Sequence, residues 1–109
     1  MTDHLHLSAR HRDMIESILS DKVPGVEVWA YGSRVNGRSF DGSDLDLVLR
    51  APDLARIPTE QLISLKHALT ESMIPFLVEV RDWYRLPKQF HREIERQYVV
   101  LIPKKHDTS

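Results

Sequence analysis

The sequence predicts a single α/β domain in which helices flank a short mixed sheet. Helix-like and strand-like apolar patterns alternate along the chain, as expected when helices pack on a sheet. The 109 residues suffice for one hydrophobic core, so we interpret 1–109 as one domain. Hydrophobic residues make up 41% of the chain and charged residues 28%, which is typical of a folded globular protein.

The first predicted element is a helix from about Ser8 to Lys22. Ser8 is a favourable N-cap residue, and Pro24 with Gly25 ends the pattern. Apolar residues recur at helical spacing, namely Met14, Ile15, Ile18 and Leu19. Residues 1–7 and the polar end 104–109 are expected to be flexible. The histidines of this region are expected to be solvated rather than metal ligands, namely His4, His6 and His11.

Two strands are predicted next, on either side of a glycine-containing loop. Residues 26–31 are rich in β-branched and aromatic side chains, and a Gly-Ser turn follows them directly. Residues 38–43 are polar and contain two residue types that favour loops, glycine and aspartate. Residues 44–49 alternate between aspartate or valine and leucine, so the leucines face one side of the sheet and Asp44 and Asp46 the other.

The second half of the chain repeats the alternation of helix and strand. Residues 59–73 carry apolar side chains near helical spacing, and a proline follows at position 75. A third strand is predicted at 76–82. A last helix begins near Pro87, which suits a first helical turn. The apolar stretch 98–102 is expected either to pair with a sheet edge or to contact a partner.

Charge and composition exclude several classes of protein. Fifteen basic and 16 acidic residues give a net charge of -1, so a nucleic-acid partner is not favoured. The chain has no cysteine and no apolar run long enough to cross a bilayer. We therefore expect no membrane association and a cytoplasmic location.

The stretch from Gly32 to Leu47 contains residues suited to phosphate and metal chemistry. Gly32 lets backbone approach a phosphate closely, and Ser33 with the first amides of its turn can donate hydrogen bonds. Asp44 and Asp46 lie two residues apart on one strand face, where like charges repel unless a cation separates them. Carboxylate oxygens are the ligands that magnesium prefers.

This stretch resembles the nucleotidyltransferase superfamily that includes DNA polymerase β. The resemblance is to the small minimal nucleotidyltransferases often paired with HEPN-domain proteins. It rests on Gly32-Ser33-Arg34 and, ten residues later, Ser43-Asp44-Leu45-Asp46-Leu47, and it extends from the first helix through the strand 76–82. It implies the polymerase β-like nucleotidyltransferase fold, a nucleoside triphosphate substrate and Mg2+.

The resemblance also implies roles for individual residues. Asp44, Asp46 and Glu79 map onto the three carboxylates that bind metal and act in catalysis. Gly32, Ser33, Arg34 and Ser43 map onto the nucleotide-binding part, although Arg34 is equally suited to capping its turn. Aspartate is usual at the third position, so Glu79 departs from the pattern. Asp82 is a rival, but it differs from Glu79 by an odd number of residues and must face the other side.

The function implied by the resemblance is transfer of AMP from ATP to a hydroxyl group of a partner protein. Small relatives of this type resemble antitoxins that modify a tyrosine of a HEPN-type ribonuclease. The partner is expected to dock near Trp83-Tyr84 and the stretch 98–102, and an oligomer is possible. The alternative is a catalytically weak module of the same fold that neutralises a HEPN-type partner by binding it.

Overall fold

The computed structural model describes residues 5–104 and contains a four-stranded mixed sheet flanked by helices, which confirms the predicted fold class. The strand order is β3-β2-β1-β4. These strands are β1 (Glu27–Tyr31), β2 (Leu45–Arg50), β3 (Val78–Asp82) and β4 (Tyr98–Ile102). β1 pairs antiparallel with β2 and β4, whereas β2 and β3 run parallel and are joined by a crossover helix.

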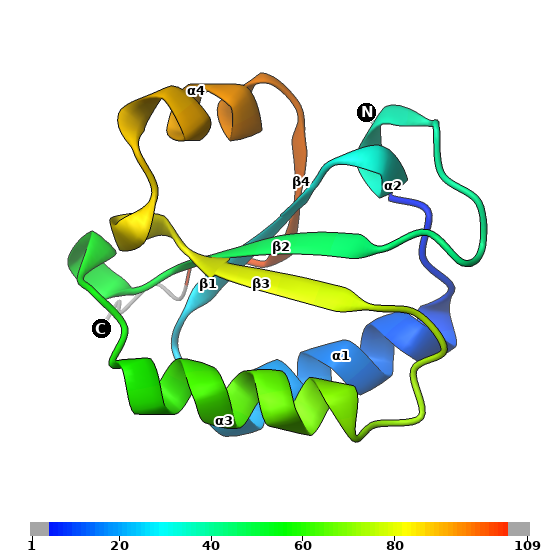
Figure 1. Ribbon diagram of the computed structural model, residues 1–109, viewed down its shortest axis with the longest axis horizontal. Helices are drawn as coiled ribbons and strands as arrows, with labels where there is room; N and C mark the ends of the chain where they lie inside the picture. Colours follow the sequence, from blue (N-terminus) through cyan, green and yellow to red (C-terminus); the bar gives the residue numbers. More distant parts are fainter. Residues whose placement is uncertain (1–4, 105–109) are drawn as a thin grey trace.

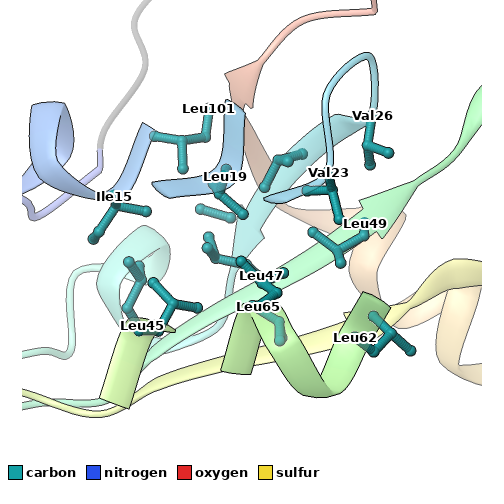
Figure 2. Close-up of a cluster of buried hydrophobic side chains, with 14 of the residues drawn as sticks. Ile15, Leu19, Val23, Val26, Leu45, Leu47, Leu49, Leu62, Leu65 and Leu101 are labelled. Carbon is teal, nitrogen blue, oxygen red and sulfur yellow. The ribbon is translucent and has the colours of Figure 1, made fainter. Parts of the chain in front are cut away.

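Two long helices cover one face of the sheet and enclose the main core (Figures 1 and 2). These helices are α1 (Ala9–Lys22) and α3 (Thr59–Thr70), which contact each other. Their apolar stripes meet the leucines of β2, which are fully buried at positions 45, 47 and 49. The alternation read from the sequence therefore assigned this face of β2 correctly, and Asp46 points to the opposite face.

The opposite face of the sheet is covered only in part. Helix α4 (Lys88–Arg96) lies over it through Ile94, which packs against an aromatic cluster from the strands and the segment after β3. The other buried members of this cluster are Trp29, Tyr31, Val48 and Trp83. The short helix α2 (Ser33–Asn36) and the loop after it lie at the end of the sheet where β2 and β3 begin (Figure 1). The catalytic candidates occupy that end.

Most predicted elements are present, with shifts at their ends. Helix α1 begins after Ser8, whose hydroxyl accepts a hydrogen bond from the His11 amide, and it ends at Lys22 as predicted. Helix α3 ends at Thr70 rather than Met73, because the Ser72 hydroxyl donates to the Leu69 carbonyl and closes a turn. Two short 3-10 turns, η1 (Pro52–Leu54) and η2 (Trp83–Arg85), were not predicted.

The stretch 98–102 forms β4 on the edge of the sheet, which is one of the two expected alternatives. The expected flexible start is packed at residues 5–7: Leu5 and Leu7 contact the core, and the His6 amide donates to the Arg34 carbonyl at 2.7 Å. Residues 1–4, including His4, and 105–109 lie outside the described part. None of the helices within 5–104 has the length and apolarity needed to span a bilayer.

Candidate functional site

The Gly32 turn and the strand β2 meet at one end of the sheet. Gly32 follows β1 with φ +86° and ψ -154°, a conformation that favours glycine. A Cβ atom at Gly32 would lie 2.5 Å from Oδ2 of Asp46. Both requirements exclude other residues, so the absence of a side chain at Gly32 lets the turn approach the Asp46 carboxylate.

Strand pairing brings the predicted third carboxylate beside the second. Asp46 is the register partner of Tyr31 on β1 and of Glu79 on the parallel strand β3. All three side chains therefore belong to the face that α4 covers in part. Asp44 precedes β2 and is exposed.

The rival carboxylate, Asp82, has a different environment. It is 2% exposed and accepts hydrogen bonds from the amides of Ile57 at 3.0 Å and Tyr84 at 3.2 Å. Arg85 forms an ion pair with it at 3.2 Å. These contacts stabilise the end of β3 and leave Asp82 unable to reach Asp46.

The charged groups around Asp46 have opposite effects on its pKa. Burial raises the pKa of Asp46; Arg81 opposes that shift, while Asp44 and Glu79 add to it. The Arg81 guanidinium lies 3.8 Å from Glu79 and donates to the Tyr31 hydroxyl at 3.4 Å. Burial also raises the pKa of Tyr31, and Arg81 again opposes the shift. The site thus combines an excess of negative charge with one nearby arginine.

The donor set fits a divalent metal ion by its chemistry. Three carboxylates supply the hard oxygen atoms that such ions require, and Gly32 keeps the space beside Asp46 free of a side chain. Within residues 5–104, however, no three acidic, histidine or cysteine side chains are gathered closely enough to form a ready-made metal site. The nearest cation to Glu79 is the Arg81 guanidinium, at 3.8 Å.

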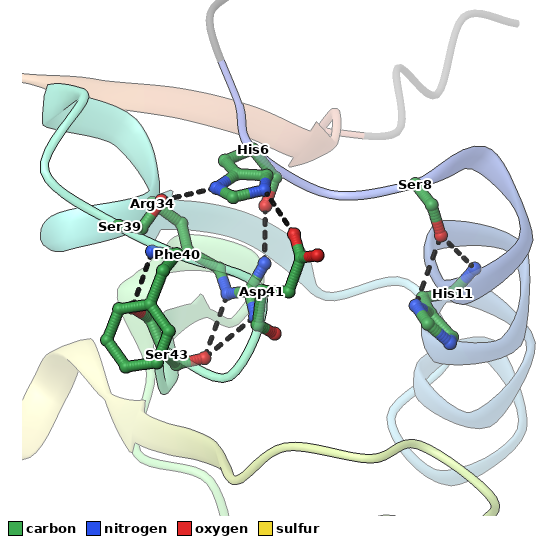
Figure 3. Close-up of polar contacts among 8 residues, drawn as sticks. All are labelled: His6, Ser8, His11, Arg34, Ser39, Phe40, Asp41 and Ser43. Carbon is green, nitrogen blue, oxygen red and sulfur yellow. Dashed lines mark hydrogen bonds and ion pairs between the residues drawn. The ribbon is translucent and has the colours of Figure 1, made fainter.

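Arg34 lies behind the turn, where its guanidinium contacts the loop that leads to β2 (Figure 3). It is 3% exposed, and its guanidinium lies 4.1 Å from the centroid of the Phe76 ring. It donates to the carbonyls of His6 at 2.7 Å, Asp41 at 2.7 Å and Ser43 at 2.8 and 3.0 Å. Burial lowers the pKa of Arg34, and Asp41 and Asp44 oppose that shift. These contacts fit support of the turn, which is one of the two roles expected for Arg34.

The loop between Gly37 and Asp44 is further held by His6. Its ring nitrogens lie 2.6 Å from the Ser39 hydroxyl and 3.1 Å from the Asp41 carboxylate. Ser43 accepts a hydrogen bond from the Phe40 amide at 2.9 Å. His6 is exposed to solvent, as expected, but its contacts with this loop were not predicted, because no local pattern links it to residues more than thirty positions away.

A cavity of about 320 Å³ lies beside the turn, between β1, α2 and α4. Gly32 contributes to its wall, so the cavity is continuous with the turn. The remaining lining includes aromatic and amide side chains, among them Tyr31, Phe90, Asn36 and Gln97. The charged residues Glu93 and Arg96 complete the rim, so more of the lining is polar than apolar.

The expected docking surface around Trp83-Tyr84 needs correction. Trp83 is 6% exposed because it packs edge-on against Trp29 and stacks on His91. Tyr84 is 59% exposed. Trp83 is therefore part of the second core, and a partner at this end could contact Tyr84 but not Trp83.

Comparison with known protein families and sequences points in one direction. Residues 2–97 match the family described as poly(A) RNA polymerase, mitochondrial-like, central palm domain. The chain is 36% identical over 112 residues to a protein of Haemophilus influenzae named probable protein adenylyltransferase MntA. The alignment covers 99% of this chain and 94% of that protein, so it includes both the Gly-Ser turn and the three carboxylates.

Two solved structures share the fold at lower identity. One is described as a toxin-antitoxin with AMP-PNP, at 20% identity and a TM-score of 0.71. The other is described as the toxin-antitoxin MntA-HpeT carrying two aspartate-to-glutamate changes, at 18% identity and a TM-score of 0.71. Each match covers 88% of this chain and 76% of the other.

Proposed function

Because this chain belongs to the palm-domain family that matches residues 2–97, and because it is 36% identical to the MntA relative, we propose that this nucleotidyltransferase moves AMP from ATP to a hydroxyl group of a partner protein. The observation that carries this proposal is the contact between the Gly32 turn and Asp46, with Glu79 in register beside it. The names of the relatives support adenylyl transfer, an ATP-like ligand and a toxin-antitoxin setting.

In the proposed complex, the triphosphate lies over Gly32 and Ser33, whose turn approaches the carboxylates closely. Ser43 borders the same space, and Arg34 supports both segments from behind. The nucleoside extends into the cavity beside Gly32, whose volume of about 320 Å³ lies within the usual range for small-molecule sites. Asp44, Asp46 and Glu79 would hold Mg2+, which when bound offsets the negative charge of the phosphates.

The reaction is a displacement at the α-phosphate. The acceptor oxygen forms a bond to the α-phosphorus, and the bond from that phosphorus to the bridging oxygen of the β-phosphate breaks, so pyrophosphate leaves. Glu79 accepts the proton of the acceptor hydroxyl, because its carboxylate is 41% exposed and borders Asp46. A tyrosine of a HEPN-type protein is the proposed acceptor, and modification of that partner would constitute an antitoxin role.

One observation favours a second function, in which the chain only binds its partner. Glu79 stands where aspartate is usual, and its carboxylate lies 3.8 Å from the Arg81 guanidinium. If that arrangement persists with nucleotide bound, the fold would neutralise a HEPN-type partner by covering it, without transfer.

Both functions are tested by intact-mass measurement of a HEPN-type partner incubated with this protein, ATP and Mg2+. We expect a mass increase of one or more AMP groups on the partner, and loss of that increase in the Asp44→Asn, Asp46→Asn double variant. Asp13→Asn is the matched control, because Asp13 is an exposed carboxylate on α1. A stable complex without a mass increase would favour the binding module, and AMP addition to free RNA would contradict the protein acceptor.

A further inference from the structure

Arg81 is a cation placed inside a group of carboxylates. It follows Glu79 by two residues on β3, so its side chain emerges on the same face of the sheet. Its guanidinium lies 3.8 Å from the Glu79 carboxylate, 3.4 Å from the Tyr31 hydroxyl and 5.8 Å from the centroid of the Phe90 ring on α4. Arg81 therefore joins three elements around the position that the proposed metal ligands border.

The polar contacts of Arg81 are weak enough to be replaced by contacts with water. Its side chain is 39% exposed and its two polar contacts are long. Arg34 shows the contrast within the same protein, because it is 3% exposed and its contacts range from 2.7 to 3.0 Å. Releasing Arg81 into water costs little because half-exposed ion pairs are weak, whereas releasing Arg34 would break four short and partly buried hydrogen bonds.

Arg81 and a divalent ion would compete for the same carboxylate. A metal ion takes oxygen lone pairs directly, and a guanidinium donates hydrogen bonds to those same atoms. The Arg81 guanidinium lies 3.8 Å from the Glu79 carboxylate, the same group that is in register with Asp46 and would serve the metal ion. A bound metal ion would replace the positive charge that Arg81 supplies and would repel the guanidinium.

We propose that Arg81 is a resident, exchangeable cation that neutralises the carboxylates of the nucleotide-free protein and is displaced from Glu79 when metal binds. This inference rests on the proposed function, because it takes Asp44, Asp46 and Glu79 as the metal ligands. Its consequence is that the empty protein binds a divalent ion weakly. Metal then binds well only together with a triphosphate, whose oxygen atoms add ligands and negative charge.

The test is a calorimetric titration of the protein with Mn2+ in the absence of nucleotide. We expect Arg81→Met to bind Mn2+ about tenfold more tightly than the wild type, a gain limited by solvent screening at a half-exposed site. Arg81→Lys keeps the charge and should stay near the wild type. Arg92→Met is the matched control, because Arg92 is an exposed arginine on α4. The gain should disappear when Arg81→Met is combined with Glu79→Gln.

A purely structural role for Arg81 predicts the opposite sign, since loss of its contacts would loosen the site and weaken Mn2+ binding. Weaker, unchanged or undetectable Mn2+ binding by a folded Arg81→Met variant would overturn the inference, and thermal unfolding establishes that the variant is folded. Failure of the proposed function is a separate result: Mn2+ binding that depends on Asp46 and tightens in Arg81→Met, with no AMP transfer to the partner, would reject the transferase and keep this role for Arg81.

Discussion

Gly32 adopts a backbone conformation that few residues share, and it does so next to Asp46. Gly37, five residues later, has a similar φ of +82°. The two glycines differ in their surroundings: a Cβ atom at Gly32 meets the Asp46 carboxylate, whereas one at Gly37 meets nothing within 4 Å. Their comparison separates backbone strain from the close approach of turn and carboxylate.

We expect Gly32→Ala to weaken binding of ATP with Mg2+ at least tenfold, because the new methyl group pushes the Asp46 carboxylate out of position. Gly37→Ala should cost roughly 1 kcal/mol of stability through backbone strain and leave nucleotide affinity nearly unchanged. Calorimetric titration of both variants, alongside thermal unfolding, measures the two effects. Equal losses of affinity would show that the approach to Asp46 is not what Gly32 provides.

At the scale of single residues, the sequence indicated the Gly-Ser turn and the carboxylates that the fold brings near one another, but not all of their contacts. The Gly-Ser turn and the two aspartates were recognisable because their signals are local: a small residue after a strand, and carboxylates two apart. Arg34 contacts carbonyls up to 28 residues away, so the sequence could not decide whether it binds a phosphate or supports its turn. Arg81 follows Glu79 by two residues, so strand alternation puts both on one face, but the sequence does not indicate that the guanidinium also reaches Tyr31 on β1.

At the scale of elements, β3 presents two carboxylates to opposite sides of the sheet, as alternation predicted. Glu79 faces Asp46, and Asp82 is buried at the end of the strand. The alternation follows from strand geometry and is visible in sequence, whereas the register that pairs Asp46 with Glu79 is not. That register depends on how the crossover from β2 through α3 docks on the sheet, which is a nonlocal packing choice.

The two carboxylates of β3 should therefore respond differently to loss of charge. Glu79→Gln should slow AMP transfer strongly while changing stability little, because Glu79 is 41% exposed. Asp82→Asn should cost about 1–3 kcal/mol of unfolding free energy, since it weakens a buried acceptor of two amides and an ion pair. Transfer per folded molecule should persist in Asp82→Asn. Loss of transfer in a folded Asp82→Asn protein, with full transfer by Glu79→Gln, would reverse the two assignments.

At the scale of the whole molecule, the ionised Asp46 carboxylate that the proposed site requires lowers the stability of the fold. The pKa of Asp46 is raised above its ordinary value of 3.8 in the folded protein, chiefly by burial. The folded state therefore holds a proton at Asp46 more tightly than the unfolded state does. This contribution to stability is present below the unfolded pKa and is lost as the pH rises through the folded pKa. At neutral pH the ionised Asp46 destabilises the nucleotide-free fold.

Asp46→Asn should consequently stabilise the nucleotide-free protein at neutral pH, by less than about 1 kcal/mol because water and Arg81 screen the charge. The advantage over the wild type should shrink as the pH falls through the raised pKa of Asp46 in the folded protein, and it should be lost below the ordinary value of 3.8. Urea unfolding of both proteins at several pH values measures this difference, with Asp13→Asn as a control for an exposed carboxylate. A variant less stable than the wild type at neutral pH would contradict the raised pKa.

Arg34 has a consequence for how the protein can change over evolutionary time. Its four hydrogen bonds end on main-chain oxygens of His6, Asp41 and Ser43, and every amino acid carries such an oxygen (Figure 3). Arg34 therefore depends on the backbone path of the loop and not on the side chains of the loop. Substitutions in the loop can alter the surface offered to a substrate or partner while the connection between the Gly32 turn and β2 keeps its shape. An arginine at this position would thus allow the side chains of the loop to change while the backbone path that leads to Asp44 stays the same.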